Sequence, residues 1–326
     1  MRLITFDDII ESYTKARQRG PGFLASKLKL DALARTKSAF NPSAKQHSDW
    51  WLIPLIRDRW NYLISGDPQI NYKQLLVNDL LEDAKGLRLL SLGSASGGHE
   101  MELAAQPGFH EITCIDIAQN RVDEAQQEAE KRGLKNISFT CVDFNEYEFP
   151  EESFDLVLFN SSLHHFNRVE ELLSGPVKRT LKPGGLLIIN EYVGPTRLQF
   201  PRQQRLAINQ ALKLVPDKYK TRFKTTLVKR RFYGSGLLRM ILADPSECID
   251  SASILPALHA HYNIHIEKPY GGNILMSVLK DISHHFTGSD SESDAVLKDL
   301  IQFEDMYLEK HPSDFIFGLY EKPADS

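Results

Sequence analysis

Residues 87–100 read Leu-Arg-Leu-Leu-Ser-Leu-Gly-Ser-Ala-Ser-Gly-Gly-His-Glu, and this stretch decides how the rest of the chain is interpreted. Leu87–Leu92 has the length of a buried strand, and the small residues 93–98 predict a turn before a helix at His99–Ala105. Such a unit can bind a nucleotide, because backbone N–H groups and the helix dipole face the ligand. The spacing Gly93-x-Ala95-x-x-Gly98 also fits a relaxed dinucleotide fingerprint, so this stretch alone does not identify the ligand.

Composition places the chain among soluble globular proteins. Its 326 residues suffice for one large or two smaller domains, and 42% are hydrophobic and 25% charged. A net charge of −4 argues against a dedicated nucleic-acid binder. The first residues are acidic where a secretory signal is apolar, and no run approaches the roughly 18 apolar residues of a membrane span. We therefore expect a cytoplasmic protein that binds neither nucleic acid nor membrane.

The three cysteines, Cys114, Cys141 and Cys248, are widely spaced and form no Cys-x-x-Cys pair. This pattern predicts neither a disulfide framework nor a zinc site. Cys114 and Cys141 lie in apolar, strand-like runs and are expected to be core thiols. No histidine pairs with acids at metal-ligand spacing, so no metal is predicted.

Residues 1–82 predict a helical region, since apolar positions in 51–64 and 72–81 recur on one helical face. Pro21-Gly22, Asn41-Pro42 and Gly66-Asp67-Pro68 divide it into three segments. Its tryptophans either pack this layer or line a substrate pocket, with Trp51 as the candidate for the second role.

From Leu87 strands and helices alternate, which predicts a parallel sheet covered on both faces. The expected strands are 87–92, 111–116, 136–143, 154–160, 186–191, 263–268 and 315–320. The expected helices are 119–132, 170–181, 252–261, 274–286 and 295–309, with a mobile acidic linker at 287–294.

Residues 195–250 interrupt the alternation and predict a helical insertion, with helices at 203–214 and 237–243. This segment holds 12 Lys and Arg residues against 4 acids, a net charge of +8. A basic cover would suit an acidic substrate. We expect it to act as a lid in which Arg202 and Arg205 contact that substrate.

Polar side chains end four of the first five predicted strands: Asp116, Asp143, Asn160 and Glu191. In open α/β sheets, ligands bind at the carboxyl ends of the strands. A carboxylate at the second strand end can accept two hydrogen bonds from a ribose diol. Each residue alone could equally be solvated in a loop, but four at consecutive strand ends favour a site.

The order of Leu-Ser-Leu-Gly-Ser-Ala-Ser-Gly-Gly (90–98), Ile-Asp-Ile (115–117), Val-Asp-Phe (142–144), Phe-Asp-Leu-Val-Leu-Phe-Asn (154–160) and Leu-Lys-Pro-Gly-Gly (181–185) resembles the class I S-adenosylmethionine-dependent methyltransferases. The resemblance covers roughly 85–193. It implies a Rossmann-like, doubly wound sheet of seven strands, the last antiparallel. On this basis we expect a helical cap at 1–82 and a methyltransferase domain at 83–326, with the lid at 195–250.

Carried over by position, the resemblance implies S-adenosylmethionine as cofactor. The turn would wrap its methionine part, Asp116 would bind the ribose, and Asp143 the adenine amino group. The chain departs from the family pattern at Ser91, where an acid is usual, and at Ala95, where glycine is usual. The full set of expected cofactor contacts is Ser91, Gly93, Ser94, Ala95, Gly97, Asp116, Ile117, Asp143, Phe144 and Asn160.

Asn160-Ser-Ser-Leu-His-His-Phe166 would lie beside the transferred methyl group in this family. A histidine titrates near neutral pH and suits general-base work. His164 is the expected base, and His165 is the alternative, although both could be structural. Glu191 would orient the imidazole, bind substrate or make a loop contact, and Tyr192 is a further pocket candidate.

The sequence therefore predicts O-methylation of a small acidic or polar metabolite in secondary metabolism, with His164 as base. The acceptor could be free or bound to a carrier protein, and a homodimer is a further expectation. N- or C-methylation by proximity stays open, as do an NAD-dependent oxidoreductase and a scaffold that binds cofactor without catalysis.

Overall fold

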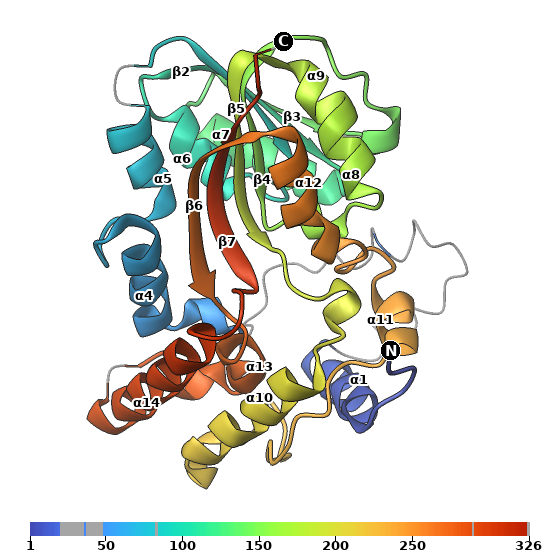
Figure 1. Cartoon of the computed structure of the whole chain (residues 1–326), viewed down its shortest axis with the longest axis vertical. Coiled ribbons are helices and arrows are strands. Elements are labelled where there is room, and N and C mark those ends of the chain that lie inside the picture. Colours follow the sequence, from blue (N-terminus) through green and yellow to red (C-terminus); the bar gives the residue numbers. More distant parts are fainter. Residues whose placement is uncertain (20–35, 37–47, 82–83, 289, 325–326) are drawn as a thin grey trace. The chain divides into compact units, whose positions relative to one another are not determined.

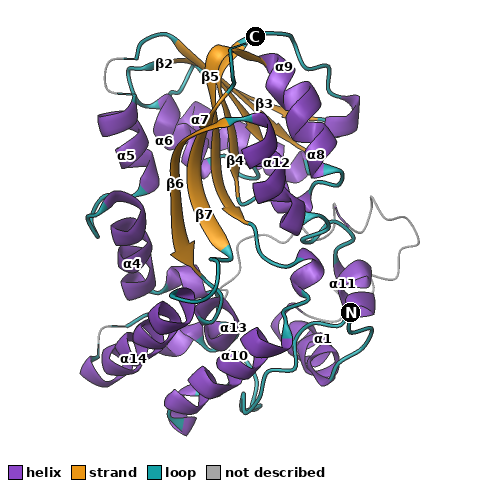
Figure 2. Cartoon of the chain, in the orientation of Figure 1, coloured by secondary structure: helices purple, strands orange, loops and turns teal. Residues whose placement is uncertain are grey.

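The computed structural model describes residues 1–19, 36, 48–81, 84–288 and 290–324. Its strands form one seven-stranded sheet in the order β3-β2-β1-β4-β5-β7-β6 (Figures 1 and 2). The strands are β1 (Leu87–Leu92), β2 (Phe109–Asp116), β3 (Ile137–Cys141), β4 (Phe154–Asn160), β5 (Leu181–Tyr192), β6 (Asn263–Gly271) and β7 (Phe315–Glu321).

The sheet has the predicted topology. β1 pairs in parallel with β2 and β4, β2 with β3, and β4 with β5. The strands read as continuous apolar runs because helices cover both faces of the sheet, and Leu89, Leu90 and Val157 are fully buried. Lys322 N, after β7, donates to Gly185 O, early in β5, over 2.9 Å. The last strand is therefore antiparallel to β5, which confirms the doubly wound fold.

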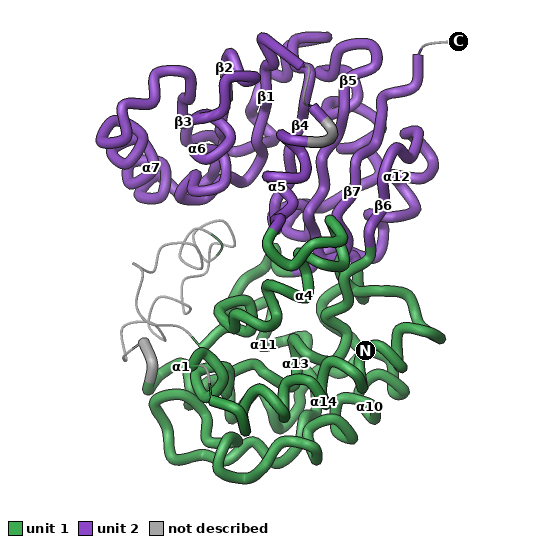
Figure 3. Tube along the Cα trace, turned by 90° about the vertical axis from the view of Figure 1, so that its left-hand side faces the viewer, with its two compact units in different colours: residues 1–69, 194–247, 269–315 green, residues 70–193, 248–268, 316–326 purple. Residues whose placement is uncertain are grey.

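The chain divides into two compact units (Figure 3). Unit 1 holds residues 1–69, 194–247 and 269–315, and unit 2 holds 70–193, 248–268 and 316–326. The predicted boundary at 82/83 and the lid at 195–250 stay predictions. The helices are α1 (Phe6–Arg19), α4 (Pro54–Ser65), α5 (Tyr72–Leu75), α6 (Gly98–Ala104), α7 (Gln119–Lys131), α8 (Val169–Leu172), α9 (Lys178–Thr180), α10 (Arg202–Leu214), α11 (Leu237–Ala243), α12 (Ile254–His261), α13 (Leu275–Leu279) and α14 (Ser291–Leu308).

Two predicted helices are shorter or more broken than expected. The helix at 170–181 is interrupted by a π-helical turn that contains Pro176 and a non-helical Gly175. The helix at 274–286 ends at Leu279, and the buried Lys229 explains this end. Its Nζ donates to the carbonyls of Ser277 (2.6 Å) and Lys280 (2.7 Å), so a distant side chain satisfies the helix terminus.

The acidic stretch at 287–294 was predicted to be a mobile linker, and this is wrong for its second half. Ser291–Asp294 form the first turn of α14. The Asp290 side chain accepts hydrogen bonds from the backbone N–H groups of Glu292 (3.1 Å) and Ser293 (2.9 Å). The serines and acids are therefore an N-cap sequence.

In the helical N-terminal region, Trp50 is buried and packs edge-on against Trp60, with ring centroids 4.6 Å apart. It also contacts Phe315, and both contacts lie within unit 1. Trp51 is 49% exposed and takes no part in this cluster. The predicted breaks at Pro21-Gly22 and Asn41-Pro42 lie outside the described residues. Among the described helices, none combines the length and apolarity that crossing a membrane requires.

Glu304 joins three segments of unit 1. This fully buried residue of α14 accepts hydrogen bonds at Oε1 from the N–H groups of Ile274 (2.8 Å) and Leu275 (3.0 Å) at the start of α13. Its Oε2 lies 3.1 Å from Nη1 of Arg59 on α4. The carboxylate therefore caps one helix and binds a second from the surface of a third.

Asp314, just before β7, is a buried carboxyl group whose Oδ2 accepts a hydrogen bond of 2.6 Å from Gln204 Nε2. Burial raises its pKa to about 7, against the smaller opposing effect of Gln204. In the unfolded chain the pKa of an Asp is about 3.9. The folded state therefore holds this proton more tightly, and that stabilisation is lost as the pH rises through about 7.

We predict that Asp314→Asn removes part of the pH dependence of stability. Between pH 5 and pH 8 the wild type should lose on the order of 2–3 kcal/mol from this group, and the variant should not. Urea unfolding at both pH values measures the difference. Asp299→Asn, an exposed change on α14, is the matched control. An equal pH dependence in Asp314→Asn and wild type would contradict the prediction.

Candidate functional site

The turn between β1 and α6 leaves no room for side chains at two glycines. Gly93 has a φ of +77°, and a Cβ there would lie 2.6 Å from Ser162 Cβ. Gly97 has a φ of +66°, and a Cβ there would lie 2.3 Å from the Phe139 ring. Ser162 Oγ also donates to Leu92 O (2.6 Å), so the turn lies against the segment that follows β4.

Asp116, at the end of β2, holds this turn in place. Its Oδ2 accepts a hydrogen bond from Ala95 N and its Oδ1 one from Ala118 N, both of 2.8 Å. Ala95 has a φ of +49°, the left-handed conformation that the usual glycine would adopt without strain. Burial raises the pKa of Asp116, against these backbone hydrogen bonds. Each oxygen keeps a lone pair for a further donor.

Glu100, in the first turn of α6, is a residue that the sequence analysis missed. Ser91 Oγ donates to Glu100 Oε1 over 2.7 Å, and both residues are buried. Burial raises the Glu100 pKa, and the hydrogen bond from Ser91 lowers it by less. The helix therefore places a carboxyl group beside Ser91, the position where the family pattern usually has an acid. The sequence did contain a signal for this residue, because Glu100 is an acid in the first helical turn after the small residues 93–98.

The ends of β2 and β3 place three more expected residues. Ile117 is half-buried after Asp116. Asp143 is the N-cap of a short turn, and its Oδ1 accepts hydrogen bonds from Asn145 N (3.0 Å) and Nδ2 (2.8 Å). The Phe144 ring packs edge-on against Phe166, with centroids 4.7 Å apart. Phe144 thus links the end of β3 to the segment after β4.

Glu191, the penultimate residue of β5, is fully buried and accepts four hydrogen bonds. Its Oε2 accepts from Ser162 N (2.7 Å) and Leu163 N (2.6 Å). Its Oε1 accepts from Tyr192 N (2.8 Å) and contacts His164 Nδ1. A carboxylate that already accepts three backbone N–H groups requires a donor at Nδ1, so the acceptor lone pair of His164 is on Nε2.

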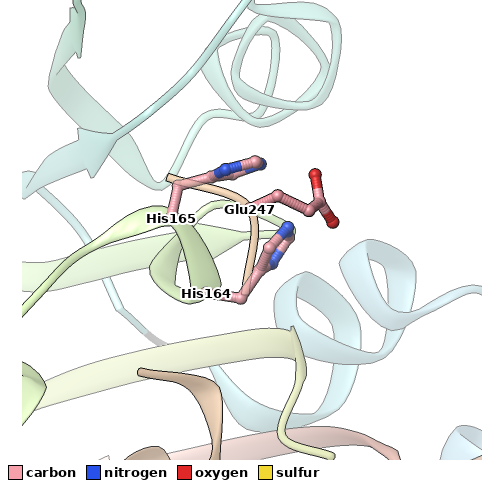
Figure 4. Close-up of side chains that lie close together, drawn as sticks. All are labelled: His164, His165 and Glu247. Carbon is pink, nitrogen blue, oxygen red and sulfur yellow. The ribbon is translucent and has the colours of Figure 1, made fainter. Parts of the chain in front are cut away.

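His164 and His165 lie on one short turn after β4, Leu163–His165 (Figure 4). Their ring centroids are 4.2 Å apart, and the rings of His164 and Tyr192 are nearly perpendicular, with centroids 6.4 Å apart. Ile249 N donates to His164 O over 3.1 Å. Glu191 contacts His164, and no such contact with Glu191 is found for His165 in the described part of the chain.

The remaining expected residues are spread over both units. Asn160 accepts a hydrogen bond from Asn190 Nδ2 (2.7 Å) across β4 and β5. Ser94 is buried beside Gly93. Trp51, Arg202 and Arg205 belong to unit 1, where Trp51 and Arg202 are exposed and Arg205 is half-buried. Unit 2 alone therefore brings together the expected cofactor residues, His164 and Glu191.

Part of the basic charge in residues 195–250 is paired within the fold, which the sequence analysis did not foresee. Arg239 pairs with Asp8 and Glu11, Arg222 with Asp281, and Lys218 with Glu292. Lys229 is buried against backbone carbonyls. Acids from elsewhere in unit 1 therefore pair with Lys218, Arg222 and Arg239, three of the 12 basic residues of this segment.

A family model described as a methyltransferase domain matches residues 83–244, about half of the chain. A rice protein named 24-methylenesterol C-methyltransferase 2 is 34% identical over 118 residues, which cover 36% of this chain and 32% of that protein. Demethylmenaquinone methyltransferase of Thermus thermophilus is 28% identical over 48% of this chain and 69% of its own length. The chain thus spans only about a third of the rice relative.

Among solved structures, the [4+2]-cyclase SpnF is similar with a TM-score of 0.46 and 20% identity, covering 87% of this chain and 98% of that one. The YcgJ protein of Bacillus subtilis has a TM-score of 0.45 and 16% identity.

Gly97 and Gly98 form a matched pair for testing the turn. Gly97→Ala places a Cβ against Phe139 in a left-handed conformation, whereas a Cβ at Gly98 meets no atom within 4 Å. We expect Gly97→Ala to lower the free energy of unfolding by roughly 2–4 kcal/mol and Gly98→Ala to have little effect. Urea unfolding compares them, and equal stability of the two variants would disprove the role of Gly97.

Proposed function

The chain belongs to the class I S-adenosylmethionine-dependent methyltransferases, and we propose that it methylates an oxygen atom of a small acidic or polar molecule with His164 as general base. The observation that carries this proposal is the contact of the buried Glu191 with His164 Nδ1, beside the turn that follows β1. The family match argues against the oxidoreductase alternative.

The residues at the carboxyl ends of β1–β3 fit the cofactor. Gly93 and Gly97 keep the turn free of side chains, and Asp116 has lone pairs that a ribose diol could reach. Within the described residues, no acceptor is found for Ser96 N or Gly98 N, at the N-terminus of α6. These groups can donate to a bound ligand. When bound, S-adenosylmethionine supplies a methyl group activated by a sulfonium.

The part of His164 is to take a proton from the acceptor hydroxyl. Glu191 fixes the ring orientation and keeps the proton on Nδ1, so Nε2 carries the lone pair. Once Nε2 is protonated, the ring is cationic, and the buried carboxylate stabilises that charge. Because Glu191 is also bound by the N–H groups of Ser162 and Leu163, it cannot swing away from the ring.

The acceptor atom is the least constrained part of the proposal. The matched relatives include proteins named as a C-methyltransferase and as an N-methyltransferase. An amine or activated carbon needs alignment more than a base. The acceptor could be free or attached to a carrier protein. A chain that binds cofactor without transferring its methyl group is the remaining alternative.

Asp116→Ala tests the cofactor site. Loss of charge-assisted hydrogen bonds should weaken S-adenosylmethionine binding by about 1–3 kcal/mol. Calorimetric titration of the folded variant measures this, with Asp299→Asn as a control that removes an exposed carboxylate elsewhere. Unchanged affinity, or binding of NADH in place of the methyl donor, would sink the assignment.

His164→Ala tests the base. We expect kcat for methyl transfer to fall by roughly 10²–10⁴, with cofactor affinity nearly unchanged. The rise of kcat/KM with pH through the neutral range should vanish in the variant. Release of S-adenosylhomocysteine on a panel of phenols and carboxylic acids provides the assay.

His165→Ala is the matched control for this experiment, because it removes the neighbouring imidazole and leaves the contact of His164 with Glu191 in place. Glu191→Gln should also reduce kcat, because the NH2 group of the amide then faces hydrogen-bond donors, either His164 and Tyr192 or Ser162 and Leu163. If His164→Ala keeps its activity and its kcat/KM still rises with pH through the neutral range, methyl transfer needs no base and proceeds by proximity. A nitrogen acceptor is then favoured. If only His165→Ala loses activity, the base is His165.

A further inference from the structure

Two arginines of unit 1 lie close together without an acidic partner. Arg2 precedes α1, and Arg205 lies in the first turn of α10. Burial, and then the positive charge of Arg205, lower the pKa of Arg2. Neither guanidinium forms an ion pair with any described residue, and Nε of each is buried without an acceptor there, as is Nη2 of Arg2.

Arg2 is held in this position by the surrounding backbone. Its Nη1 donates to Phe200 O (3.0 Å), and its backbone N donates to Gln199 Oε1 (2.9 Å). Its carbonyl accepts from Leu237 N (2.8 Å). A Cβ at Gly234, whose φ is +86°, would lie 3.0 Å from Arg2 Nη2, so only glycine leaves room for the guanidinium. The position of Arg2 is therefore built into the packing of unit 1.

The helix that carries Arg205 is tied to the same region. Asn209, one turn further along α10, donates from Nδ2 to Phe232 O (2.8 Å) and accepts at Oδ1 from Phe232 N (2.9 Å). Phe232 is two residues before Gly234. The Asn209 amide therefore binds α10 to the segment around Phe232 and Gly234 through two hydrogen bonds. Because Arg2 packs against Gly234, the two arginines are held near one another.

This pair differs from three other basic side chains of unit 1 that are largely buried. Arg222 and Arg239 are bound to acids, and Lys229 donates to backbone carbonyls. A buried donor without an acceptor costs free energy, and two adjacent guanidinium groups add repulsion. A planar guanidinium matches the geometry of carboxylate and phosphate oxygens, which would relieve both costs.

We propose that Arg2 and Arg205 form a binding site for an oxyanion, either the carboxylate or the phosphate group of a small molecule. The site does not depend on the proposed function. Arg205 was expected from the sequence to contact substrate, whereas Arg2 was not. The oxyanion accepts hydrogen bonds from both side chains and separates their charges.

Anion binding is tested without methyl transfer. The full chain is titrated calorimetrically with inorganic phosphate and, separately, with succinate, at constant ionic strength. We expect the wild type to bind at least one of them, and Arg205→Gln and Arg2→Gln to weaken that binding at least tenfold. Lys213→Gln, an exposed change of the same charge on α10, should bind as the wild type does. Binding of phosphate but not succinate indicates that the natural ligand is a phosphate ester. Binding of succinate but not phosphate indicates that it is a carboxylate.

Thermal unfolding separates this site from a structural role. Without anion, Arg205→Gln should melt at the same temperature as the wild type or above it, because repulsion with Arg2 is removed. With anion, only the wild type and Lys213→Gln should gain stability. Binding of neither anion by the wild type, or equal binding by Arg205→Gln, would overturn the site. Because these readouts need no acceptor, they are independent of failure of methyl transfer in His164→Ala.

Discussion

The buried carboxylate of Glu191 organises the chemistry of unit 2. It accepts the N–H groups of Ser162 and Leu163 from the segment after β4 and that of Tyr192 on its own strand. A charge so deeply buried is tolerated because four donors surround it. One of these donors is His164, so the same interaction that shapes the segment also sets the tautomer of the imidazole. Fold and proposed catalysis depend on one carboxylate.

The turn between β1 and α6 also depends on a few buried carboxyl groups. Asp116 uses both oxygens to hold the backbone at Ala95 and Ala118, and Glu100 supplies the acid that is absent at Ser91. An acid therefore lies next to position 91, although it comes from α6 and not from β1. In unit 1, three of the basic residues that suggested a charged surface, Lys218, Arg222 and Arg239, are bound to acids within the fold. Arg2 and Arg205 differ from them in having buried Nε groups for which no acceptor is found among the described residues.

Local patterns predicted most of the fold. β1 and β4 have the expected bounds, because an apolar run between turn residues depends on few distant contacts. The early end of α13 could not be predicted, since its carbonyls are satisfied by Lys229 from another part of the sequence. Glu191 was predicted from its place at a strand end, but its bonds to Ser162 and Leu163 were not. Arg2 escaped notice because its neighbours come from residues 199–237.

Glu304 has a consequence for synthesis of the chain. It lies on α14, near the end of the sequence, yet it caps α13 and binds Arg59 on α4. The first 69 residues share a unit with 269–315, so α4 leaves the ribosome long before its ionic partner exists. Unit 2 also contains 316–326, including most of β7. Unit 1 therefore cannot complete its core before α14 has been made, and unit 2 cannot complete its core before β7 has been made.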